Sequence, residues 1–99
     1  MSRPGHWARA VIRKEVEIVN KLGLHARAAA KLVTCAGSFA SHVQLERNGQ
    51  RVNGKSIMGV MMLAAARGSA VTLLIEGEDE GAACAALEQL VASRFGEDE

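Results

Sequence analysis

Apolar and polar residues alternate along three short segments, and this period of two constrains the fold more than any other feature of the sequence. In residues 12–18 the apolar side chains share one parity and most charged ones share the other. The alternation returns in residues 42–47 and 70–76. Strands of this kind form sheets with one buried and one solvated face, which favours antiparallel pairing. A parallel sheet covered on both faces is therefore disfavoured.

Turn and helix signals lie between these strands. Asn48-Gly49 is a strong hairpin signal and places a return strand at residues 50–53. Apolar residues recur at helical spacing in residues 25–36, 56–66 and 80–94. The predicted order is β-α-β-β-α-β-α. Half-solvated strands with helices over their other face make an α+β layer fold.

The length of 99 residues leaves room for one domain. Only three aromatic residues stand against 17 alanines. We therefore expect a small aliphatic core, with helices lying close to the sheet. We interpret residues 1–10 as a flexible leader, residues 11–95 as the domain and residues 96–99 as an acidic tail.

Composition disfavours several classes of function. The chain has no dense basic stripe and few aromatic residues to stack on bases, which argues against nucleic-acid binding. The longest apolar run, residues 57–66, is too short to span a bilayer, and the N-terminus lacks the apolar core of a secretory signal. Cys35 and Cys84 lie among alanines without metal-like spacing. We expect two buried, reduced cysteines, no metal site, no membrane contact and a cytoplasmic protein.

The most informative motif is Gly23-Leu24-His25-Ala26-Arg27. His25 stands at a predicted helix start, where unpaired backbone N–H groups and the positive end of the helix dipole meet. This environment favours a neutral imidazole that can attack, and the same N–H groups can then bind phosphoryl oxygens. The guanidinium of Arg27 also suits a phosphate. The alternative is an exposed histidine without a chemical role. No acidic residue close in sequence completes a hydrolytic triad.

Residues 49–56 match the nucleotide-binding pattern G-x-x-x-x-G-K-S. Domains of that type need a mostly parallel sheet, whereas the strand before this motif has one polar face. Asn48-Gly49 also predicts a tight hairpin, which would keep the first glycine away from any phosphate. We therefore reject a nucleotide site, and a calorimetric titration with ATP would detect one.

A third candidate site lies at the start of the helix predicted for residues 56–66. Ser56 is expected to be its N-cap, and a regulatory phosphorylation site is the sharper alternative. Met58 and Met62 are four residues apart and should point away from the core, where adaptable methionines suit docking to several partners. Helical spacing predicts a core-facing stripe made of Ile57, Val60, Met61 and Ala64.

The motif around His25 and the segment Lys55-Ser56-Ile57-Met58-Gly59, in this order and at this separation, resemble the HPr-type phosphocarriers of the bacterial phosphotransferase system. The similarity covers residues 11–95. It implies an open-faced β-sandwich, in which three helices cover one face of a four-stranded antiparallel sheet. Residues 93–96 with the acidic end, together with Lys21-Leu22, are similar to the nitrogen-related branch of the family (NPr).

The resemblance implies a phosphocarrier with a phosphohistidine intermediate, rather than a stand-alone enzyme, and no cofactor. His25 would accept a phosphoryl group on Nδ1 from Enzyme I, of the sugar or the nitrogen type, and donate it to an EIIA protein. Arg27 would contact the phosphoryl group. Ser56 matches the serine that HPr kinase/phosphorylase modifies in some members. The resemblance places partner docking on Lys55, Ile57 and Met58.

One position departs from the family pattern, which usually has proline where this chain has Ala28. Proline fixes a backbone angle and lacks an N–H donor, so Ala28 should preserve the helix and add one N–H near the site. A second class of function stays open: a regulatory binding module of the same fold, acting through Ser56 and the Met58/Met62 patch. We expect a monomer in either case.

Overall fold

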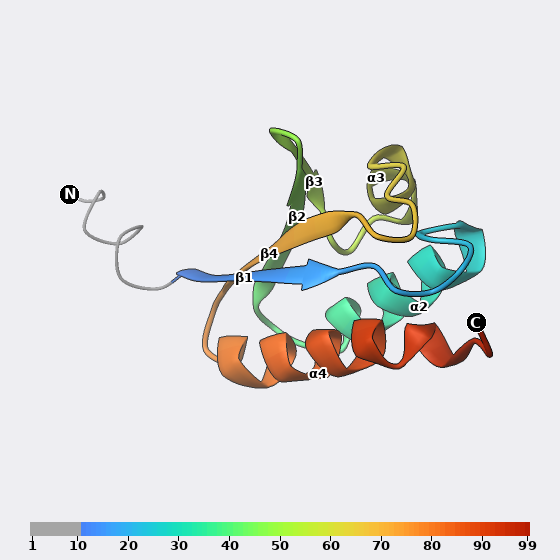
Figure 1. Ribbon diagram of the computed structural model, residues 1–99. Coiled ribbons are helices and arrows are strands. Elements are labelled where there is room, and N and C mark those ends of the chain that lie inside the picture. Colours follow the sequence, from blue (N-terminus) through green and yellow to red (C-terminus); the bar gives the residue numbers. More distant parts are fainter. Residues whose placement is uncertain (1–10) are drawn as a thin grey trace.

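The computed structural model describes residues 11–99, which form one antiparallel sheet and a layer of helices (Figure 1). The strands are β1 Val11–Glu17, β2 His42–Arg47, β3 Gln50–Asn53 and β4 Ala70–Glu76, in the order β1-β4-β2-β3. The helices are α2 Ala26–Gly37, α3 Ile57–Met62 and α4 Glu80–Ala92, followed by the 3-10 turn η1 Arg94–Gly96. The α+β open-faced sandwich and the predicted order of elements are confirmed. The leader predicted for residues 1–10 lies outside the described residues.

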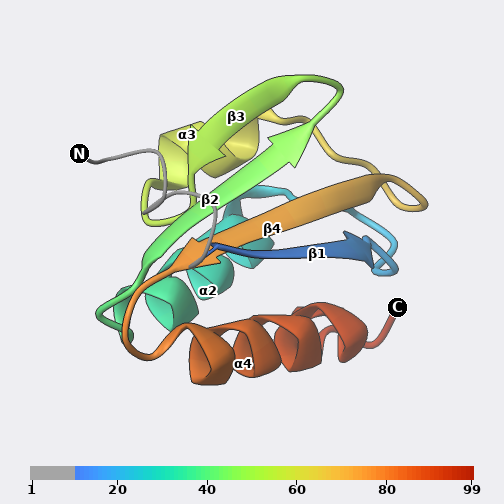
Figure 2. The same cartoon turned by 90° about the vertical axis from the view of Figure 1, so that its left-hand side faces the viewer.

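Strand β4 organises the sheet because it pairs with both β1 and β2. Figure 2 looks onto the open face, with α2 behind the sheet and α4 along its β1 edge. The side chains of Val71, Leu73 and Ile75 alternate along β4 and are buried. Alanines of α2 are fully buried too, which lets the helix lie close to the strands. The predicted small aliphatic core is confirmed.

Helix α3 is shorter than the alanine-rich sequence predicts. It ends at Met62, and Ala64 takes a left-handed backbone with φ +50°. Ala65 is buried, and its carbonyl accepts a hydrogen bond of 2.9 Å from the N–H of Leu24. Tertiary packing against the loop before α2 therefore overrides the helix propensity of the alanines.

The core stripe predicted for this segment is mostly wrong. Val60 is fully buried as expected, but Ile57 is 43% and Met61 40% exposed, and Ala64 is exposed. Six residues make fewer than two turns, so α3 presents only a narrow face to the domain. The expected exposure of Met58 and Met62 is confirmed, at 75% and 63%.

The chain turns after the end of α4. The helix ends at Ala92 instead of the predicted Arg94, because Arg94 and Phe95 adopt left-handed angles with φ +60° and +56°. The Phe95 side chain is fully buried and anchors this turn in the core. Gly96 continues it with φ +76°. The last residues are thereby directed towards the start of α2.

Strand β3 divides the segment that matches the nucleotide-binding pattern, which agrees with the rejection of a nucleotide site. Asn48 and Gly49 form the β2–β3 turn with φ +52° and +82°, whereas Gly54 and Lys55 follow the far end of β3. No single loop can therefore carry both glycines around a phosphate. Among the described residues, no three His, Cys, Asp or Glu side chains are placed to hold a metal ion. None of the helices in residues 11–99 has the length and apolar character needed to cross a membrane.

Both cysteines are free, as predicted, but they are not equally buried. Cys84 is buried, whereas Cys35 is only half-buried, which corrects the expectation of two buried thiols. Burial raises the pKa of both thiols. They are therefore poor nucleophiles at neutral pH.

Candidate functional site

The loop before α2 fixes the position of His25. Gly23 has φ +68°, and a Cβ there would lie 2.5 Å from the carbonyl oxygen of Ala65. Only glycine meets both conditions without strain. The next residue, Leu24, is buried and donates its N–H to the same carbonyl. The loop is thus held on the segment after α3, and His25 emerges from it at the beginning of α2.

His25 is the N-cap of α2, with an extended backbone and no side-chain capping bond. Its carbonyl accepts the N–H of Ala29 at 2.8 Å, which closes the first turn. The N–H groups of residues 26–28 precede that bond, and the first N–H groups of a helix have no carbonyl partner within it. Ala28 lies in this first turn, so the expectation that the helix tolerates alanine there is confirmed. The helix start offers donors suited to an anion.

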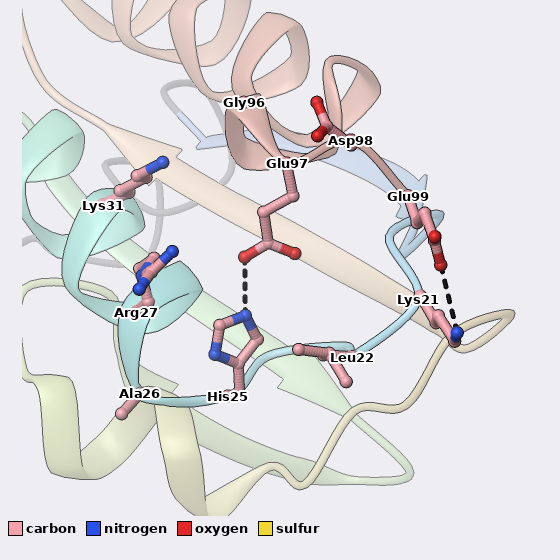
Figure 3. Close-up of a pocket in the computed structure, with 10 residues that line it drawn as sticks. All are labelled: Lys21, Leu22, His25, Ala26, Arg27, Lys31, Gly96, Glu97, Asp98 and Glu99. Carbon is pink, nitrogen blue, oxygen red and sulfur yellow. Dashed lines mark hydrogen bonds and ion pairs between the residues drawn. The ribbon is translucent and has the colours of Figure 1, made fainter.

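The imidazole of His25 is oriented by a residue from the other end of the chain (Figure 3). Its Nε2 lies 2.6 Å from Oε2 of Glu97, and the His25 side chain is 29% exposed. The second ring nitrogen, Nδ1, faces the beginning of α2 and Arg27 in Figure 3. One nitrogen is therefore bound to a carboxylate, while the other points to where an anion would sit.

Three basic side chains line the same open pocket: Lys21, Arg27 and Lys31. The exposed guanidinium of Arg27 forms no hydrogen bond or ion pair with any residue in the described part of the chain. Lys31, one turn further along α2, donates to the carbonyl of Phe95 at 2.6 Å. A fourth basic residue, Lys55, does not line this pocket. Its Nζ donates to the carbonyl of Phe39, beyond the opposite end of α2.

The acidic tail packs against this pocket. Lys21 binds Glu99 twice, through the backbone N–H at 2.8 Å and through Nζ at 3.1 Å. Glu97 is only 14% exposed, and its Oε1 accepts a hydrogen bond of 3.0 Å from Nδ2 of Asn20. The Asn20 amide, together with His25 and Lys31, lowers the pKa of the Glu97 carboxyl. Glu97 is therefore ionised at neutral pH.

Two residues of this site were missed by the reasoning from sequence. No acidic residue lies close to His25 along the sequence, yet Glu97 reaches it in space from 72 positions away. Asn20, which is fully buried, was not singled out as a site residue. A signal existed in the acidic run that directly follows Phe95 and Gly96, yet only the turn at Arg94 and Phe95 shows where that run goes. The site holds no serine or cysteine beside His25, so hydrolytic chemistry still lacks a nucleophile.

The second predicted site lies at α3. Ser56 is the N-cap, and its Oγ accepts the N–H of Gly59 at 3.1 Å, as predicted. Large exposed apolar side chains lie on α3 and on the loop before His25. A hydrogen bond from Leu24 to Ala65 joins this loop to the segment that follows α3. These exposed residues are Leu22, Ile57, Met58, Met61 and Met62, and we call them the apolar patch.

Comparison with known proteins decides what kind of molecule carries this site. A family model described as the PTS HPr component phosphorylation site matches residues 12–93. The chain belongs to the HPr family. Phosphocarrier protein HPr of Cupriavidus necator is 57% identical over 89 residues, which cover 90% of this chain and 100% of that protein. HPr of Pseudomonas aeruginosa is 54% identical over 86 residues, covering 86% and 96%.

Solved HPr structures share the fold as well. The crystal structure of HPr-C-His from Thermoanaerobacter tengcongensis superposes with a TM-score of 0.86 at 45% identity, over 89% of this chain and 99% of that one. The region that the family model matches includes His25, Arg27 and Ser56, whereas Glu97 lies beyond its end. The protein is thus an HPr-type phosphocarrier of the phosphotransferase system.

Proposed function

We propose that this HPr accepts a phosphoryl group on Nδ1 of His25 from phosphorylated Enzyme I and donates it to an EIIA protein. The observation that carries the proposal is the orientation of the His25 ring. Nδ1 faces the open start of α2, whereas Nε2 is bound to Glu97. The nucleophilic nitrogen and the donors for its phosphoryl oxygens therefore lie at one place.

The transfer step follows from this arrangement. The lone pair of Nδ1 attacks the phosphorus of the donor phosphohistidine, and the P–N bond of the donor breaks with its electron pair returning to the donor ring. The imidazole of His25 gains positive charge as the new P–N bond forms. Free N–H groups at the start of α2, and the guanidinium of Arg27, can bind the phosphoryl oxygens. In the second transfer a histidine of EIIA attacks the same phosphorus, and the P–N bond to Nδ1 breaks with its electron pair returning to the His25 ring. Neither transfer needs a cofactor or a metal.

The site suits a carrier that acts between proteins in the cytoplasm. It is open to solvent, which lets a partner histidine reach Nδ1 directly. Lys21, Arg27 and Lys31 supply positive charge that steers acidic partners. We assign docking to the apolar patch, most of which lies on α3, and to Lys55, which precedes that helix. We propose that the protein is a monomer, in which the acceptor site stays exposed.

Intact-mass spectrometry after incubation with phosphoenolpyruvate and Enzyme I tests the proposal. Sugar-type and nitrogen-type enzymes are compared in parallel, because phosphorylation by one alone assigns the branch. One phosphoryl group should be added, should be labile in acid, and should move to an EIIA protein on mixing. His42→Ala, which removes an exposed histidine of β2, is the matched control and should behave as wild type. An adduct on His25→Ala, or none on wild type with either enzyme, would contradict the proposal.

Exposure of the apolar patch favours a second role, as a regulatory module that binds partners through Ser56 and the Met58/Met62 patch. Met58 is 75% and Met62 63% exposed, so these side chains contribute little to packing within the domain. Exposed apolar side chains of this kind favour contact with a partner. A protein with both roles should retain partner binding in His25→Ala and lose it in a Met58→Ser, Met62→Ser double variant. Incubation with an HPr kinase/phosphorylase tests Ser56 separately, because a phosphoserine survives acid whereas a phosphohistidine does not.

A further inference from the structure

We infer that Glu97, held in place by Asn20, is a positioning residue for His25: it keeps the proton on Nε2, so that Nδ1 is the nitrogen that carries the phosphoryl group. The inference rests on the proposed function and deepens it. It assigns a role in phosphoryl transfer to a tail that the sequence marks only as acidic.

The geometry permits one neutral tautomer. Glu97 Oε2 lies 2.6 Å from Nε2, and an ionised carboxylate can only accept a hydrogen bond. A neutral imidazole in this contact must therefore carry its proton on Nε2 and keep the lone pair of Nδ1 free. The other tautomer would set a lone pair against the carboxylate. The same logic orients histidines in catalytic triads and metal sites.

A hydrogen bond from Asn20 holds the Glu97 carboxylate in place. Its side chain is fully buried, and Nδ2 donates to Oε1 of Glu97 at 3.0 Å and to the carbonyl of Gly23 at 2.9 Å. Its Oδ1 has no partner among the residues that the structure describes. A buried polar atom without a partner costs stability, and such atoms in native proteins often mark a function. Here the amide is retained for the two bonds that tie Glu97 to the loop bearing His25.

The backbone of the tail restrains Glu97 further. Phe95 anchors the preceding turn, and its carbonyl accepts the Lys31 ammonium at 2.6 Å. Glu99 on the other side is bonded to Lys21. Glu97 is thus fixed between two attachment points and by its own side chain, which is how a residue that positions another must be built.

Glu97 also acts on the charge that develops in the reaction. Attack by Nδ1 leaves the ring cationic, with its proton still on Nε2. A carboxylate bonded to that proton stabilises the cation without taking part in bond making or breaking. No proton has to leave or enter the ring during transfer, so the step balances with the phosphoryl group alone.

Two variants separate the tautomer from the charge. Glu97→Ala removes both effects, whereas Glu97→Gln removes the charge and keeps a single acceptor oxygen, which can serve Nε2 of His25 or Nδ2 of Asn20 but not both. Asp98→Asn is the matched control: it removes one charge from the same tail at an exposed side chain that makes no hydrogen bond within residues 11–99. The readouts are the nitrogen-15 shifts of the His25 ring in the unphosphorylated protein and the rate of phosphorylation by Enzyme I.

Wild type should show the Nε2–H form alone. Glu97→Ala should populate both tautomers and accept the phosphoryl group about tenfold more slowly. Glu97→Gln should populate the wild-type tautomer to a lesser extent than wild type, with a rate between those of wild type and Glu97→Ala, and Asp98→Asn should stay within about twofold of wild type. A Glu97→Ala protein with the wild-type tautomer and the rate of Asp98→Asn overturns the inference while leaving the proposed function intact. Failure of wild type to be phosphorylated at His25 overturns both.

Discussion

Helices α2 and α3 begin in the same way in the backbone but use their first side chains differently. Ser56 and His25 both take extended angles at the N-cap. The Ser56 hydroxyl folds back and accepts the N–H of Gly59, whereas the His25 ring makes no capping bond and turns to Glu97. One helix start is closed by its own side chain, and the other is left open. Helix α2 therefore lacks a capping hydrogen bond worth about 1 kcal/mol at the place where we propose that an anion binds.

Removing the His25 side chain should produce the largest effect and should separate function from fold. His25→Ala is expected to abolish phosphorylation by Enzyme I, because the acceptor nitrogen is lost. The melting temperature should change little, since the side chain caps nothing. Mass spectrometry and thermal unfolding measure the two results. An unfolded His25→Ala protein would show that the open helix start depends on the histidine for stability.

Closing the open start sharpens the same comparison. His25→Ser supplies a capping hydroxyl and should be more stable than His25→Ala by about 1 kcal/mol, with no gain in phosphorylation. Denaturant unfolding of the two variants gives the difference directly. Equal stability would mean that the first N–H groups of α2 are already satisfied, contrary to the account.

The anchor of the tail should matter more for stability than either cap. Phe95→Ala removes a fully buried aromatic side chain and should lower the free energy of unfolding by about 3–5 kcal/mol. It should also loosen Glu97 from His25. Urea unfolding measures the first effect, and the ring nitrogen shifts of His25 report the second. A loss below about 1 kcal/mol would show that Phe95 does not hold the turn after α4.

The closed helix start should give a smaller and more local effect. Ser56→Ala leaves the N–H of Gly59 without its acceptor and should cost about 1 kcal/mol. Ser56→Thr keeps the hydroxyl and serves as the control, with most of that stability retained. Phosphoryl transfer at His25 should be unchanged in both, because Ser56 lies outside the pocket of α2. Slower transfer in Ser56→Ala alone would link the two helix starts.

The pH dependence of stability compares two tethered carboxylates. Hydrogen bonds from Ser41 and Ala40 lower the pKa of Asp79. The pKa of Glu97 is lowered too, and the hydrogen bond from the Asn20 amide is the main cause. Because both folded pKa values lie below the unfolded ones, these groups stabilise the fold above about pH 4. That stabilisation is lost as the pH falls through the folded values. Asp79→Asn should flatten the acid side of a stability–pH curve, and an unchanged curve would contradict the assignment.

The sheet could be predicted from sequence because its signals are local. The bounds of β2, β3 and β4 match the alternating runs and the Asn48-Gly49 turn, since side-chain parity and turn chemistry act over a few residues. His25 and Ser56 were likewise placed at helix starts by the residues around them. These features need no knowledge of the rest of the chain.

The remainder depends on contacts between distant segments. Residues 64–66 are good helix formers, yet the loop before His25 takes the Ala65 carbonyl, so α3 stops early and Met61 stays exposed. Glu97 meets Asn20 across 77 positions because two non-glycine residues adopt left-handed angles after α4. Propensity argues against both arrangements, and only burial of Phe95 explains the second.

The most direct test of the account is to locate the phosphorus in the phosphorylated protein. Histidine labelled with nitrogen-15 allows the coupling between phosphorus and each ring nitrogen to be measured by NMR for every histidine. The account predicts coupling to Nδ1 of His25 alone, with a proton retained on Nε2. Phosphorus on Nε2 of His25, on another histidine or on Ser56 would contradict the claim that the open start of α2 is the acceptor site.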